Sequence, residues 1–175
     1  MTGRAAVLAA VSVLAGCGAG SQAGQAGAPP ATDSVTVVGV VRVVGADPLA
    51  QLVVLSEGGE PTALVGPLRS ELEQTVGLEV RVTGAAVDAM PPSRMALDVW
   101  SYETVALNGV PAHTGVLEQT DDGLRLVGAT QSWMLADPPD ALRAAVGAKA
   151  WVAGDASGGP LRVTAFGIIK RPSSP

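Results

Sequence analysis

The chain has few of the residues that most directly reveal chemistry. Among 175 residues there are one cysteine, one histidine and 3% aromatic residues. A single cysteine cannot form a disulfide within the chain, which excludes a disulfide-stapled scaffold. Charged residues make up only 15%, and 11 Lys and Arg stand against 16 Asp and Glu, a formal charge of −5. Because phosphate recognition needs clustered basic side chains, we expect no nucleic-acid partner.

Apolar residues, by contrast, are abundant, at 47% of the chain. This content is too high for an intrinsically disordered protein, since such chains lack the side chains to form a core. The length is sufficient for one or two small domains.

The first 16 residues have the organisation of a secretory signal peptide. Arg4 supplies a short positive region, and residues 5–15 form an uncharged, mostly apolar run. This run is too short to span a bilayer, which needs roughly 20 residues, but it suits the apolar region of a signal peptide. It ends in Leu14-Ala15-Gly16-Cys17.

This ending resembles the lipobox of bacterial lipoproteins. The resemblance implies that residues 1–16 are a lipoprotein signal peptide, cleaved before Cys17, and that the sulfur of Cys17 is acylated with palmitate-type chains. Membrane lipid is then the partner of Cys17, and we expect an anchor in the cell membrane or outer membrane, facing the periplasm or extracytoplasmic side. The alternative is a buried thiol in an apolar helix, which the glycines after Cys17 disfavour.

Residues 17–34 then comprise the acylated cysteine and a predicted flexible tether. Gly, Ala, Ser and Gln dominate this stretch, and no helix or strand period is present. A flexible coil of this length would span on the order of 20–25 Å.

From residue 35 onward the sequence resembles two copies of one unit. Equivalent residues recur at an offset of 76, then 70, then 64, so each change is a six-residue deletion in a predicted loop. The alternative is chance similarity between two valine-rich stretches. The recurring pairs include Gly39 and Gly115, Leu72 and Leu142, Gly77 and Gly147, Gly84 and Gly154, and Tyr102 and Phe166.

Each copy predicts the same order of elements: three strands, a short helix, then two strands. In the first helix, Leu68, Leu72 and Val76 fall on one face, and Gly77 is its expected cap. The strands of the first copy are expected at 35–44, 51–55, 61–65, 78–82 and 95–107, with a helix at 68–76. Those of the second are expected at 113–119, 124–127, 131–135, 150–153 and 161–169, with a helix at 139–146.

This order resembles that of the OB-fold, a small, partly open five-stranded barrel. We therefore expect a mostly β protein of two tandem small OB-like β-barrels, each with one short helix between strands three and four. The expected OB-like domains are residues 35–108 and 112–171. The alternative is a single β-sandwich.

Features that could indicate chemistry have simpler interpretations. His113 stands near a predicted strand start without neighbouring metal ligands. Asp121-Asp122 precedes Gly123 between two strands, which is typical of a hairpin turn. We therefore expect no metal site and no cofactor.

The segment Gly154-Asp155-Ala156-Ser157-Gly158-Gly159-Pro160 resembles the loop around the nucleophile of trypsin-like serine proteases. The resemblance would imply a hydrolase with Ser157 as nucleophile. However, Ala156 is inserted between the Asp and the Ser, which breaks the register that aims the hydroxyl at a substrate. A turn between two strands explains every residue, so we expect no catalytic residue.

Trp133 is the candidate ligand-binding residue. It lies on the third predicted strand of the second copy, and OB-folds commonly bind ligands over strands two and three. An exposed Trp there could stack on a sugar or peptide; the alternative is a barrel plug or a residue at the seam between domains. Elsewhere, simple alternation places Trp100 and Tyr102 on one strand face, and the repeat aligns Tyr102 with Phe166 as a shared core position.

The sequence therefore favours a membrane-anchored, non-catalytic binding or interaction module, with an envelope protein, a peptide or a glycan as ligand. One alternative is a structural accessory subunit of an envelope complex, without a small ligand. A hydrolase using the Asp155-Ala-Ser157-Gly-Gly loop is the less favoured alternative.

Overall fold

The computed structural model describes residues 34–91 and 93–172, which belong to one compact unit. Cys17, the predicted signal peptide and residues 17–33 of the predicted tether lie outside the described residues. In residues 34–91 and 93–172 no helix is both long and apolar enough to cross a bilayer.

The fold is mostly β, as expected. The first five strands are β1 (Ser34–Val44), β2 (Gln51–Leu55), β3 (Pro61–Val65), β4 (Glu79–Val87) and β5 (Met95–Leu107), with helix α1 (Arg69–Glu73) between β3 and β4. The next five are β6 (Val110–Thr120), β7 (Gly123–Val127), β8 (Ser132–Ala136), β9 (Lys149–Asp155) and β10 (Leu161–Lys170), with α2 (Asp140–Arg143) between β8 and β9. The expected order of elements is confirmed in both copies.

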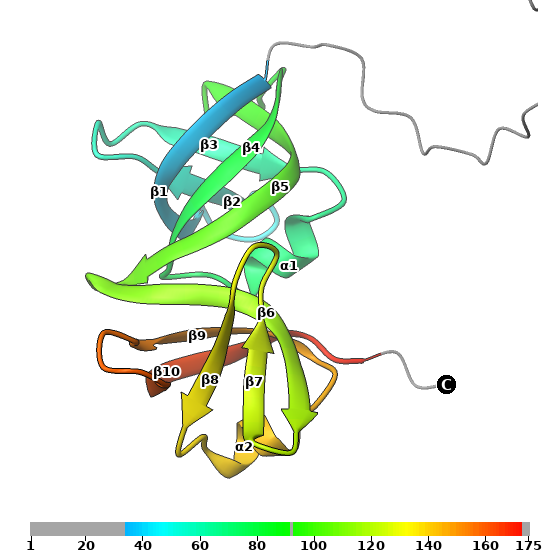
Figure 1. Cartoon of the computed structure of the whole chain (residues 1–175). Coiled ribbons are helices and arrows are strands. Elements are labelled where there is room, and N and C mark those ends of the chain that lie inside the picture. Colours follow the sequence, from blue (N-terminus) through cyan, green and yellow to red (C-terminus); the bar gives the residue numbers. More distant parts are fainter. Residues whose placement is uncertain (1–33, 92, 173–175) are drawn as a thin grey trace, which may run out of the picture. The chain divides into compact units, whose positions relative to one another are not determined.

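The ten strands of the described residues belong to one mixed sheet in which the same pairing pattern occurs twice (Figure 1). Among β1–β5, antiparallel pairings join β1 to β2, β2 to β3, β1 to β4 and β4 to β5, and β3 pairs with β5 in parallel. Among β6–β10, the corresponding antiparallel pairings recur, and β8 pairs with β10 in parallel. We call residues 34–107 the first strand group and residues 110–172 the second.

Two glycines that match in the sequence repeat lie at equivalent close approaches of two backbones. Gly39 in β1 and Gly115 in β6 lie where each strand passes close to the end of its hairpin partner. A Cβ on Gly39 would lie 2.1 Å from the carbonyl oxygen of Leu55, and one on Gly115 would lie 2.5 Å from that of Val127. Only glycine fits so close an approach of two backbones.

A β-bulge overturns one expectation. Gly84 of β4 pairs with Val99, but the preceding residue of β4 pairs with Ser101, so Trp100 is an extra residue on β5. The bulge interrupts the alternation of side chains. Trp100 is therefore 39% exposed, whereas Tyr102 packs against the core, and the prediction that they share a face is wrong.

The second strand group has the same irregularity at the equivalent place. Gly154 of β9 pairs with Val163, and the register of β10 then skips Thr164. A Cβ on Gly84 or Gly154 would lie 2.3 Å or 1.9 Å from a backbone carbonyl oxygen of the facing strand. The repeated glycines thus preserve a repeated backbone geometry.

Both helices are shorter than expected. The first ends at Glu73, so Val76 is 46% exposed and does not share the buried face of Leu72. The chain turns away because Gly77 adopts a φ of +92° and its N–H donates to the carbonyl of Val41 in β1, at 2.9 Å. Gly147 ends the turn after α2 in the same way, with a φ of +83°.

Each strand group has its own hydrophobic core, and the first core extends into the second group. Ala112 and Ala153 of the second group are buried in the first core, and Trp151 packs against it. The expected shared position is confirmed, since Tyr102 packs against the first core and Phe166 against the second.

A tight hairpin connects the two groups. Asn108 and Gly109 both have positive φ, at 50° and 81°, the conformation that favours an Asn-Gly pair in a two-residue hairpin loop. Beyond it, β5 and β6 are paired over only two residues each, and the strands then diverge (Figure 1). The Asp121-Asp122 loop is likewise a two-residue hairpin connection, as expected.

Candidate functional site

A cleft of about 580 Å³ lies where β5 and β6 diverge. Four successive residues of β5 (101–104) and four of β6 (113–116) line it. The end of β7 and the following loop (127–130) complete the wall together with Trp133 and Lys149. Its volume is in the range of known ligand sites.

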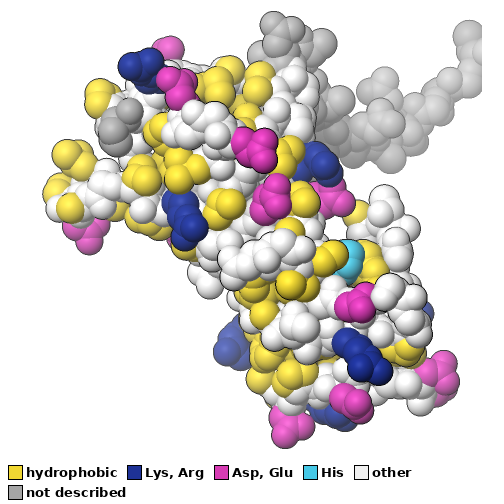
Figure 2. Space-filling model, turned by 90° about the vertical axis from the view of Figure 1, so that its left-hand side faces the viewer, with side chains coloured by type: hydrophobic (Ala, Val, Ile, Leu, Met, Phe, Trp, Pro, Cys, Tyr) yellow, Lys and Arg dark blue, Asp and Glu magenta, His cyan; other side chains and the backbone are white. Residues whose placement is uncertain are grey.

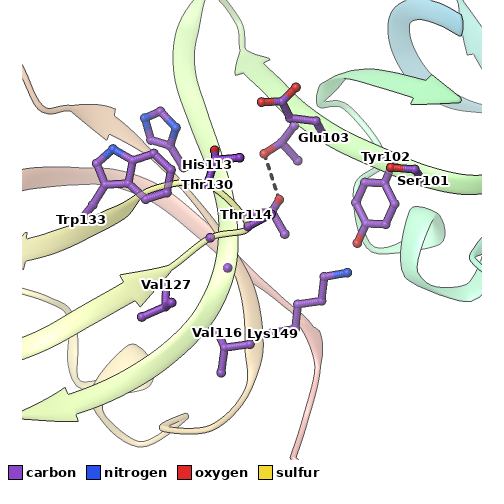
Figure 3. A pocket seen from close by; sticks show the side chains of 14 residues that line it. Ser101, Tyr102, Glu103, His113, Thr114, Val116, Val127, Thr130, Trp133 and Lys149 are labelled. Carbon is purple, nitrogen blue, oxygen red and sulfur yellow. Dashed lines mark hydrogen bonds between the residues drawn. The ribbon is translucent and has the colours of Figure 1, made fainter. Parts of the chain in front are cut away.

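One side of the cleft is an aromatic pair. The rings of His113 and Trp133 are stacked, with centroids 4.1 Å apart and planes inclined by 21° (Figure 3). Trp133 is half-buried and also packs against the second core. A Cβ on Gly128 would lie 3.0 Å from the Trp133 ring, so this glycine leaves space for the indole. Trp133 thus lines the cleft and packs against the second core.

His113 has a neutral imidazole near neutral pH. Burial of the ring lowers its pKa, and the negative charge of Glu103 only partly opposes this effect. The sequence showed a lone histidine, and its stacking partner lies 20 positions away, so no local spacing indicated the pair.

The other side of the cleft holds a charged pair bridging the two strand groups. The Tyr102 hydroxyl donates to Glu71 Oε2 at 3.0 Å, and Lys149 Nζ donates to the same oxygen. The Lys149 ammonium also lies 4.7 Å from the centre of the Tyr102 ring. Glu71 is on α1 and Lys149 is on β9, so this contact joins elements 78 positions apart.

These contacts shift two pKa values. Burial raises the pKa of Glu71, but the hydrogen bonds from Lys149 and Tyr102 and the positive charge of Lys149 outweigh it, so the net shift is downward. Burial, followed by the negative charge of Glu71, raises the pKa of Tyr102. The negative charge of Glu71 and the positive charge of Lys149 therefore balance each other, and the phenol of Tyr102 stays protonated.

The remaining polar groups of the cleft are mostly neutral. The hydroxyls of Thr104 and Thr114 lie 2.9 Å apart and are hydrogen-bonded (dashed line in Figure 3). Ser101 and Thr130 add two further hydroxyls. The carboxylate of Glu103 lies 2.8 Å from Arg81 Nη1. This set of groups can hold a neutral, partly apolar ligand by hydrogen bonds and apolar contact.

The protease-like segment forms a tight turn between β9 and β10. The Asp155 carboxylate accepts the backbone N–H of Ser157 at 2.8 Å, and this bond is the main cause of a lowered pKa of Asp155. The carboxylate thus stabilises its own turn, as the simpler interpretation expected. No cluster of three potential metal-ligating side chains occurs in the described part of the chain.

A second cavity of about 570 Å³ lies in the first strand group, beside the loops 45–50 and 88–94. Gln51 holds the second loop in place, because its amide donates to the carbonyls of Met90 and Pro91 and accepts a hydrogen bond from Ser93. Its lining is largely aliphatic. On the face drawn in Figure 2, acidic and basic side chains are interspersed among apolar ones.

Comparisons of this chain with protein-family models, curated proteins and solved structures gave no match. The chemistry of the cleft and the N-terminal sequence are therefore the observations that point to a function.

Proposed function

We propose that this chain is a lipid-anchored extracytoplasmic protein whose folded part binds a ligand without chemically changing it. The anchor is supported by the sequence Leu14-Ala15-Gly16-Cys17 at the end of a signal-like segment. Two or more acyl chains hold a protein stably in a membrane, whereas one chain does so only marginally. The anchored end faces the periplasm or the outer side of the cell membrane.

The proposed folded part is two tandem OB-like barrels. This is supported by the pairing order β1-β2-β3-β5-β4-β1, which recurs as β6-β7-β8-β10-β9-β6. The position of α1 and α2, each between the third and fourth strand of its group, supports the same fold.

The observation that carries the binding function is the cleft beside the stacked His113 and Trp133. Aromatic side chains supply apolar contact area together with a polar edge, and the surrounding hydroxyls can orient a ligand. The cleft balances its own charges, since Lys149 is paired with Glu71 and Glu103 with Arg81. A neutral segment of a peptide or glycan of the cell envelope is the ligand class that fits.

The anchor is tested by expressing the full chain and its Cys17→Ala variant in a bacterial host with labelled palmitate. The unmodified chain should be labelled, processed before Cys17 and recovered with membranes. The variant should carry no label and be either unprocessed or released, whereas Ser21→Ala should behave as the unmodified chain. A Cys17→Ala protein recovered with membranes at the processed mass would exclude the anchor.

The cleft is tested with panels of neutral peptides and glycans, measured by the rise in melting temperature of the full-length protein. Trp133→Ala should abolish the rise given by a binder, and Val43→Ala, at an exposed apolar residue of β1 away from the cleft, should leave it unchanged. Because Trp133 also packs against the second core, Trp133→Leu provides a variant that keeps apolar volume. Equal binding by all the variants would rule out the cleft as the site.

A further inference from the structure

We propose that the ligand of the cleft is an extended peptide, which adds as a strand to the edge of β5 between Ser101 and Val105. The inference rests on the proposed function, because it takes the cleft as the ligand site. It specifies both the class of ligand and the backbone groups that recognise it.

The first observation is an edge of β5 without a strand neighbour. On one edge β4 pairs with β5 from Ala96 to Ala106. On the other edge β3 reaches only to Asp98, and β6 pairs only with Ala106 and Leu107. Within the described ranges, residues 99–105 therefore have a strand on one edge alone. The N–H and C=O groups of such an edge are a template for a further strand.

The second observation is the course of the cleft. Successive residues of a strand point to opposite faces, so a cavity on one face touches every second residue. This cleft touches Ser101, Tyr102, Glu103 and Thr104 in succession, although Ser101 and Glu103 are exposed and Thr104 is buried. It therefore runs along the edge of β5. It also touches residues 113–116 of β6 in succession, and four residues of an extended chain span about 13 Å.

The third observation is the match between the cleft and a peptide backbone. The charges of Lys149 and Glu103 are paired within the protein, so an uncharged backbone with alternating donors and acceptors is the complementary partner. Val116, Val127 and Trp133 line the same cleft and offer apolar contact to side chains of an added strand.

A glycan fits this wall less well. Sugars stack on an open aromatic face, but His113 covers one face of the Trp133 ring and Gly128 lies close to its edge. The half-buried indole is therefore better suited to contact with an aliphatic side chain.

The experiment uses the full-length protein purified from membranes, together with a library of end-capped ten-residue peptides without charged residues. The strongest binder is then remade with single backbone N-methyl groups at each position. For an added strand, methylation at alternate positions should weaken binding about tenfold or more, because it removes N–H donors to β5. Methylation at the intervening positions should have little effect. Bound peptide should also slow amide hydrogen exchange within residues 101–105.

A variant that fills the cleft provides an independent test. Ala129 is exposed and lines the cleft, so Ala129→Trp should reduce peptide binding at least about tenfold. Ala141→Trp, on the exposed face of α2, is the matched control and should bind normally.

Peptide binding that shows no alternation on N-methylation overturns the inference. A neutral glycan also overturns the inference if it binds in the cleft, if Ala129→Trp abolishes its binding and if no peptide competes with it. The proposed function then still stands. If no peptide or glycan binds in a manner sensitive to Ala129→Trp, the inference and the proposed binding function both fail.

Discussion

The first and second strand groups share a pairing scheme but use the outward positions of equivalent strands differently. Glu79 and Arg81 of β4 hold the same places as Lys149 and Trp151 of β9. Arg81 is exposed, whereas the Trp151 indole donates to the carbonyl of Gln74 at the end of α1, at 3.2 Å. The outward face of β9 has thus become a contact within the molecule, while that of β4 remains at the surface.

The inward positions differ in a second way. Val37 pairs with Val82, and His113 pairs with Val152, so His113 is the counterpart of Val37. In the same manner Trp133 is the counterpart of Thr62, which is buried. The first group thus has an aliphatic residue and a small buried residue at these positions, whereas the second has a stacked aromatic pair that lines a cleft.

Loop lengths account for the location of the second cavity. The first group connects β1 to β2 through residues 45–50 and β4 to β5 through residues 88–94. The corresponding loops of the second group are residues 121–122 and 156–160. The longer pair of loops forms the aliphatic cavity of the first group. The aliphatic cavity therefore depends on loops that differ between the groups, while the strand pairing does not differ.

The largest expected effect comes from substituting the two bulge glycines, which hold equivalent places in the two strand groups. Gly84→Ala and Gly154→Ala should each lower the free energy of unfolding by roughly 2–4 kcal/mol, because the new Cβ would overlap a backbone carbonyl oxygen. Urea unfolding measures both. Gly58→Ala is the control, since nothing lies within 4 Å of its Cβ position. A neutral result at either bulge glycine would show that the two bulges are not equivalent.

A smaller effect is expected from the contact between the groups. Lys149→Met leaves the Glu71 carboxylate without its cation and should cost about 1–3 kcal/mol at neutral pH. Because folding lowers the pKa of Glu71, its contribution is present above the ordinary value of 4.5 and is lost as the pH falls through the lowered pKa. The difference in the free energy of unfolding between Lys149→Met and the unmodified chain should therefore become smaller at acidic pH.

The control for that comparison is Arg94→Met. Arg94 and Glu60 form an ion pair with exposed side chains, at 87% and 75%, and such pairs contribute about 0–1 kcal/mol. Equal losses in Arg94→Met and Lys149→Met would contradict the assigned role of Lys149.

The smallest effect is expected from making the second group resemble the first. His113→Val introduces the counterpart residue and should change stability at neutral pH by under about 1 kcal/mol. Folding lowers the pKa of His113, so the unmodified chain should lose stability as the pH falls through 6.5, where the unfolded chain takes up a proton first. Thermal unfolding between pH 7.5 and 5 should show a shallower decline for the variant. A steeper loss of stability in the variant than in the unmodified chain would contradict a lowered pKa of His113 in the folded protein.

Much of the secondary structure could be predicted from the sequence. The strands at 51–55, 61–65 and 95–107 have the expected bounds, because apolar runs between Gly, Pro and Asp mark strands directly. Strand β4 extends five residues beyond its expected end, to Val87, and both helices end early. Their ends depend on partners elsewhere in the chain, such as the carbonyl of Val41 that takes the N–H of Gly77.

At the candidate site, too, the local pattern predicted the strand of Trp133 but not its contacts with residues distant in the chain. Its place on the third strand of the second copy could be predicted, because strand order follows from local patterns. Its stacking on His113 and its half-buried state could not, since β7 lies between β6 and β8 in the sheet and only the tertiary packing brings the two rings together.

The scarcity of cysteine, aromatic residues and charge, the lipobox-like end at Cys17 and the repeat of glycines are properties of the sequence alone. They predict an anchor, a mostly β fold and two similar units, because each depends on residue type and spacing along the chain. The tertiary structure alone decided that Trp100 is the exposed residue of a bulge, that Lys149 meets Glu71 and that β5 and β6 diverge around a cleft. Each depends on which distant backbones come together, and that is set by packing and pairing across the whole sheet.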